Sequence, residues 1–79
     1  MKLQNVKRNL ARAGLQVQEI TIMCNGKETP ALDVCTDYSG PYPTAETLQQ
    51  VNTAERIAAR AGAYSEQRGY KTAVWIWQK

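Results

Sequence analysis

The sequence predicts a small α+β domain in the order α-β-β-α-β, with a three-stranded, mostly antiparallel sheet and two helices packed on one of its faces. Apolar residues recur at helical spacing in residues 2–13 and 44–68. They alternate with polar residues in the segments predicted as strands. Turn signals separate these segments, and 79 residues are enough for one domain, which we take as residues 1–79.

The first helix is predicted over residues 2–13. Leu3, Val6 and Leu10 fall on one side of it and polar residues fall on the other. Gly14 stands where a glycine that adopts a left-handed conformation would end the helix. The apolar side predicts a helix packed on the sheet.

A β-hairpin is predicted next, from strands at residues 15–24 and 31–38. The first strand changes phase, because Val17 is apolar at an odd position whereas Ile20 and Ile22 are apolar at even ones. Either a β-bulge near residues 18–19 keeps both sets on the core side, or the strand begins at residue 19.

The hairpin loop carries the turn signature Asn25-Gly26. A two-residue turn would place Ile20 and Ile22 on the face opposite to Leu32 and Val34. We therefore expect a three-residue loop with the glycine in the left-handed conformation, which puts all four on one face. In that register the two cysteines, Cys24 and Cys35, point to opposite faces, so we expect reduced thiols and no disulfide.

A proline-containing loop over residues 37–43 precedes the second helix. Thr44 is its expected N-cap, and the helix is expected to reach Arg68, where Gly69 ends it. A break into two helices near Asn52 is the alternative.

The last strand is predicted over residues 70–78. The right-handed crossover rule makes it parallel to the strand before the long helix. We expect the first strand at the centre of the sheet, in the order 3-1-2. Val74 and Ile76 lie on one face of the last strand, and Trp75 and Trp77 lie on the other.

The composition excludes several function classes. The chain has no histidine, so it offers no imidazole base, no Ser-His or Cys-His pair and no Cys/His zinc site. We expect no enzyme, no metal, no cofactor, no small-molecule substrate, no membrane span and no signal peptide. The net charge of +3 divides into basic ends and an acidic middle, because residues 1–14 carry +4, residues 15–55 carry −5 and residues 56–79 carry +4.

The two tryptophans form the first candidate site. If both helices cover the Val74 side, Trp75 and Trp77 lie on the open face of the sheet, and an exposed apolar patch indicates an interface. The alternative is that the first helix covers them as core. Acidic residues on this face favour a protein partner over stacked bases; they are Glu19, Asp33 and Asp37. The candidate protein-binding residues are Trp75, Trp77, Lys71, Lys79, Tyr38 and Tyr42.

Two arginine pairs form the second candidate site. Arg8 and Arg12 are one turn apart on the first helix, as are Arg56 and Arg60 on the second. If the helices are neighbours, the pairs merge into one basic surface for nucleic acid or an acidic partner. The alternative is an ordinary solvated helix face.

The chain resembles the small accessory proteins of bacteriophages and mobile elements, of which anti-CRISPR proteins are the best-known group. The resemblance lies in its size and α+β organisation from Met1 to Lys79, and no motif carries it. It implies a non-enzymatic inhibitor, in the cytoplasm of a bacterial host, that docks on a larger nucleic-acid-handling protein complex. A small basic nucleic-acid-binding module and a structural homodimer are the alternatives.

Overall fold

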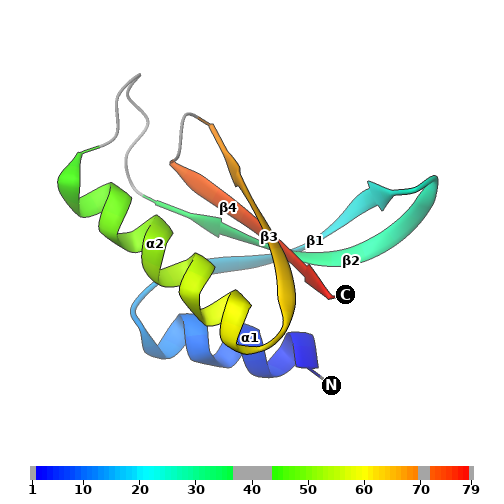
Figure 1. Ribbon diagram of the computed structural model, residues 1–79, viewed down its shortest axis with the longest axis horizontal. Helices are drawn as coiled ribbons and strands as arrows, with labels where there is room; N and C mark the ends of the chain where they lie inside the picture. The colour runs from blue at the N-terminus through cyan, green and yellow to red at the C-terminus, as the bar shows by residue number, and fades with distance from the viewer. Residues whose placement is uncertain (1, 37–43, 70–71, 79) are drawn as a thin grey trace.

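The computed structural model describes residues 2–36, 44–69 and 72–78. In these residues it has two helices and a four-stranded sheet (Figure 1). Their order along the chain is α1 (Lys2–Arg12), β1 (Gln16–Cys24), β2 (Lys27–Cys35), α2 (Ala45–Arg60), β3 (Ala63–Arg68) and β4 (Ala73–Gln78). The predicted α+β class is confirmed, whereas the predicted number of three strands is wrong.

The sheet has the strand order β1-β2-β4-β3, and every neighbouring pair is antiparallel. The last strand, β4, therefore runs antiparallel to β2 and not parallel to it. The first strand lies at an edge of the sheet and not at its centre. The crossover through α2 does return the chain in the direction of β2, but it delivers β3 to the far edge, and a hairpin then brings β4 between them.

The additional strand arises because α2 ends at Arg60, eight residues before the predicted end. Ala61 caps the helix, and Gly62 follows with a φ of +72°. A side chain rarely adopts this left-handed conformation, so the glycine ends the helix. The helix is continuous from Ala45, with no break near Asn52.

The β1–β2 hairpin closes through the two residues Asn25 and Gly26, with φ angles of +53° and +79°. Two positive φ angles are typical of a type I′ turn, so the predicted three-residue loop is wrong. The pairing is continuous from Gln16 to Cys24, without a bulge. Ile20 consequently lies opposite Ala31, and the apolar residues of β1 divide between the two faces of the sheet.

Both helix ends that the sequence specified most clearly are confirmed. Gly14 has a φ of +83°, its N–H donates to Ala11 (3.0 Å), and the N–H of Leu15 donates to the carbonyl of Leu10 (3.1 Å). This pair of bonds is a Schellman motif. At the start of α2, the Thr44 hydroxyl accepts from the N–H of Thr47 (3.2 Å) as an N-cap.

Both helices cover the same face of the sheet, as predicted, and they contact one another (Figure 1). Leu32 and Ile76, both fully buried and paired across β2 and β4, are at the centre of this layer. The buried cluster comprises Leu3, Val6, Leu10, Leu15, Leu32, Val34, Val51, Ala54, Ala58, Val74 and Ile76. Among the described residues, no helix lies on the opposite face of the sheet.

Four predicted site residues, Tyr38, Tyr42, Lys71 and Lys79, lie outside the described residues. Across the described ranges, neither helix has the length and apolar character that crossing a membrane requires.

Candidate functional site

The candidate site lies on the face of the sheet that neither helix covers, which we call the open face. Two cross-strand rows define it. The first row runs through Ile20, Ala31, Trp77 and Tyr64, and the second through Gln18, Asp33, Trp75 and Glu66. Residues directly opposite one another in a sheet share a face, so these eight side chains lie on one surface.

Three aromatic side chains, Tyr64, Trp75 and Trp77, form what we call the aromatic cluster. The rings of Tyr64 and Trp77 are paired across β3 and β4, with their centroids 5.7 Å apart and their planes tilted by 38°. Both tryptophans are half-buried, and Tyr64 is 49% exposed. Ala31, the small residue opposite Trp77 in the same row, is buried, and contacts between aromatic rings stabilise such a cluster.

Arg68 covers part of this cluster. Its guanidinium carbon lies 3.7 Å from the centroid of the Trp75 ring, a cation–π contact. One guanidinium nitrogen also lies 3.8 Å from a carboxylate oxygen of Glu66. The open face therefore already holds one guanidinium between an indole and a carboxylate.

Asp33 is the direct neighbour of Trp75 on the adjacent strand. Its Oδ1 atom is buried and has no hydrogen-bond partner in the described part of the chain. Burial raises the pKa of the nearby Cys35 thiol, and the negative charge of Asp33 raises it further. Among the described residues, no cation lies within salt-bridge distance of the Asp33 carboxylate.

The open face is concave. A hollow of about 400 Å³ lies between the far part of β1 and the strands β3 and β4. Its lining comprises Thr21, Ile22, Met23, Cys24, Glu66, Arg68, Trp75 and Trp77. Figure 1 shows the β1–β2 hairpin extending beyond the rest of the sheet, and this arm supplies one wall of the hollow.

The sequence pattern placed Trp75 and Trp77 on the open face, and the structure places them there. It also placed Glu19 on this face, which is wrong: Glu19 pairs with Leu32 and binds Gln4 of α1 on the covered face. Tyr64 and Arg68 were missed as site residues because residues 61–68 were assigned to the helix. The signal that finds them is Gly62 followed by the alternation Tyr64, Glu66, Arg68.

The four predicted arginines lie on the helical layer, and all four are exposed. Arg8 donates to the side-chain oxygen of Asn5 (3.2 Å), and Arg60 lines a hollow between the helices together with Asn9 of α1. None of the four makes a salt bridge within the described residues. The contact between α1 and α2 thus brings both pairs onto one layer of the molecule.

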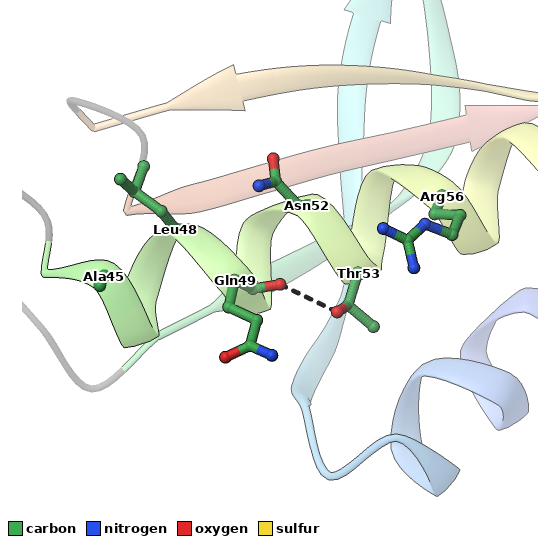
Figure 2. Close-up of a pocket in the computed structure, with 6 residues that line it drawn as sticks. All are labelled: Ala45, Leu48, Gln49, Asn52, Thr53 and Arg56. Atoms are coloured by element: carbon green, nitrogen blue, oxygen red, sulfur yellow. Dashed lines mark hydrogen bonds between the residues drawn. The ribbon is translucent and has the colours of Figure 1, made fainter.

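Arg56 also borders a hollow of about 430 Å³ along α2 (Figure 2). All six lining residues come from this one helix, and the hydrogen bond drawn there joins the Thr53 hydroxyl to the Gln49 carbonyl, 2.9 Å apart. Groups from a single exposed helix do not converge on a ligand. The hollow is therefore a feature of the helix surface and not a substrate pocket.

Within the described ranges, His, Cys, Asp and Glu form no group of three or more that could hold a metal ion. No protein-family model, no curated protein and no solved structure matches the chain.

Proposed function

We propose that this protein is a non-enzymatic binding protein that docks on a partner protein through its open face. The observation that carries the proposal is the aromatic cluster, which lies on the sheet face that neither α1 nor α2 covers. Tryptophan and tyrosine are enriched among the residues that dominate the binding energy of protein interfaces. Their rings supply large contact areas at a low entropic cost.

The aromatic cluster supports a protein partner better than it supports stacked bases. A platform for single-stranded nucleic acid needs free ring faces and surrounding cations. Here Arg68 covers the Trp75 ring and is itself paired with Glu66, while Asp33 adds a negative charge to the same row. The mixed charge around the rings is typical of a protein interface.

The narrower role, inhibition of a larger nucleic-acid-handling complex in a bacterial cytoplasm, follows from the resemblance in size and organisation alone. It makes the partner one subunit of such a complex. Affinity capture from a bacterial host, followed by mass spectrometry, identifies that partner.

The capture is made with three variants in parallel. We expect Trp75→Ala and Trp77→Ala to lose the partner, and Arg56→Gln on the helical layer to retain it. Circular dichroism and thermal unfolding check that each variant is folded. A partner that all three variants retain contradicts docking through the open face. If Trp75→Ala and Trp77→Ala both unfold the domain, the tryptophans are core residues and the assignment of this face to an interface is wrong.

A small nucleic-acid-binding module is the second candidate, and the arginines of the helical layer favour it. Arg8, Arg12, Arg56 and Arg60 are exposed and have no carboxylate within salt-bridge distance among the described residues. Such a surface predicts an affinity for DNA or RNA that falls steeply with salt. A mobility shift at low salt tests it, and no salt-sensitive binding contradicts it. A structural homodimer, the third alternative, predicts a dimeric mass at micromolar concentration.

A further inference from the structure

We propose that the open face recognises a cationic side chain of its partner, with arginine as the fitting chemistry, and that Asp33 is the counter-charge. The inference rests on the proposed docking function and specifies the partner's chemistry. It is argued from two separate observations, one on Asp33 and one on Arg68.

The first observation is the unsatisfied carboxylate. Removing a charged oxygen from water without giving it a partner is costly, so nearly all buried polar atoms are paired in folded proteins. Asp33 Oδ1 is an exception among the described residues. The residue as a whole is only half-buried and lies between Gln18 and Trp75 on the face that neither helix covers, so part of it is open to a docked partner.

The second observation is the position of the Arg68 guanidinium, between an aromatic ring and a carboxylate. Its guanidinium carbon lies 3.7 Å from the centroid of the Trp75 ring, and a guanidinium nitrogen lies 3.8 Å from a Glu66 carboxylate oxygen. Indole and carboxylate together are thus shown to hold a guanidinium on this surface. A second indole and a second carboxylate share this face: Trp77 lies in the neighbouring row, and Asp33 lies opposite Trp75 with no cation within salt-bridge distance among the described residues.

The chemistry of these groups selects the ligand. An aromatic face attracts cations through its quadrupole, and a carboxylate accepts charge-assisted hydrogen bonds from a guanidinium. Arginine meets both requirements with one planar group, whereas lysine offers a compact, strongly hydrated charge. A partner segment that presents an arginine therefore complements the row, and an acidic segment is repelled by Asp33.

The test uses the full chain and a capped hexa-arginine peptide as the probe, with a capped peptide of the neutral isostere citrulline as its control. Binding is followed by the indole N–H resonances of the protein. We expect the arginine peptide to shift both indole signals and the citrulline peptide to shift neither. Equal binding of the two peptides overturns the proposal.

Two variants assign the binding to Asp33. We expect Asp33→Asn to lower the affinity for the arginine peptide about tenfold, which corresponds to the loss of one charge-assisted hydrogen bond. Glu46→Gln removes the same charge from the exposed first turn of α2, and we expect it to leave the affinity unchanged. Equal affinities of Asp33→Asn and the wild type, or equal losses in the two variants, overturn the assignment.

Thermal unfolding of Asp33→Asn provides a readout independent of binding. Asp33 Oδ1 has no hydrogen-bond partner among the described residues, and an amide oxygen can also accept from the Cys35 thiol, so we expect the variant to be as stable as the wild type or more stable. A large loss of stability overturns the proposal, since it shows that the carboxylate serves the fold. Arg68→Ala uncovers the Trp75 ring and releases Glu66, so we expect it to bind the arginine peptide with several-fold higher affinity. A lower affinity contradicts the idea that Arg68 occupies a cation-binding position.

The failures of the two proposals are distinguishable. If the captured partner is lost by Trp75→Ala but fully retained by Asp33→Asn, the open face docks a partner and the cation inference is wrong. If neither variant loses it, both proposals are wrong.

Discussion

Asp33 and Trp75 lie directly opposite one another on β2 and β4, so a carboxylate and an indole share one row of the open face. The face that packs under the helices has the opposite character, because its paired residues at the same strands are Leu32 and Ile76. The sheet thus separates a layer of buried apolar side chains from a layer of polar and aromatic groups that neither helix covers. This separation makes the two roles testable with different substitutions.

The thiol of Cys35 reports on the charge of Asp33. Burial raises its pKa and the neighbouring carboxylate raises it further. In a Cys24→Ser background, we expect the pH profile of alkylation of Cys35 to have its midpoint above the ordinary thiol value of about 8.5. Asp33→Asn should lower the midpoint, and burial should keep part of the shift. A wild-type midpoint at or below 8.5 contradicts this environment.

The stability of the domain also depends on this thiol at alkaline pH. Because the folded pKa is raised, the neutral thiol favours the folded state, and its contribution is present below the ordinary pKa and lost as pH rises through the folded value. We expect thermal stability to fall above about pH 8.5 more steeply in the wild type than in Cys35→Ser. Parallel unfolding profiles of the two proteins over that range contradict the prediction.

Leu32 tests the hydrophobic core, because it is fully buried between the sheet and the helices. Leu32→Ala should lower the free energy of unfolding by about 2 to 5 kcal/mol, because it removes buried methyl groups and leaves a cavity. Met23→Ala is the matched control, since Met23 is 68% exposed, and we expect a change within about 0.5 kcal/mol. Chemical denaturation measures both, and equal losses would contradict the assigned layers.

Gly62 tests the end of α2. Nothing lies within 4 Å of a Cβ built there, so a substitution changes the backbone conformation alone. With a φ of +72°, Gly62→Ala should cost about 1 to 2 kcal/mol, and Gly62→Asn should cost less because asparagine tolerates this conformation. An unchanged or increased stability of Gly62→Ala indicates that the helix continues past this point.

Glu19 tests how α1 is held on the sheet. Its carboxylate accepts a hydrogen bond from Gln4 (2.8 Å) and lies 3.6 Å from the Lys7 ammonium, and both interactions lower its pKa. The stabilisation is present above the ordinary glutamate value of about 4.3 and is lost as pH falls through the lowered one. We expect Glu19→Gln to melt below the wild type at pH 7 and together with it at pH 3. A difference in melting temperature that grows as the pH is lowered contradicts this prediction.

Helix ends and layers were predictable from the sequence where one residue type determines the local conformation. Gly14 ended the first helix and Thr44 began the second, because a left-handed glycine and an N-cap hydroxyl act over a few residues. The face of the tryptophans was predictable as well, because alternation in a strand assigns Trp75 and Val74 to opposite sides regardless of the neighbours.

Strand pairing was not predictable in the same way. The two-residue turn that Asn25 and Gly26 form is incompatible with a hairpin whose apolar residues all face the core, and a three-residue loop is therefore the expectation from the apolar pattern. Ile20 instead lies on the open face opposite Ala31, and Ala31 separates it from Trp77 in the same row. The aromatic cluster makes that face apolar enough to accommodate an isoleucine. Because the cluster is formed by more than one strand, the pattern of a single segment does not predict it.

The extra strand was missed for a related reason. Residues 63–68 are mostly exposed, so they carry little hydrophobic periodicity, and their partner is β4, which lies later in the chain. The Arg68–Trp75 contact, which defines part of the candidate site, depends on that pairing. A site whose residues come from three strands can be recognised only when the order of the strands in the sheet is known.

Fluorine NMR of the protein labelled with 5-fluorotryptophan tests whether the partner docks on the open face. The chain has two tryptophans, and both lie on the open face. Single Trp→Phe variants assign the two signals. On addition of the captured partner, both the Trp75 and Trp77 signals should shift or broaden as the complex forms. A complex that forms while both signals remain unchanged would show that the partner binds elsewhere and would contradict docking through the open face.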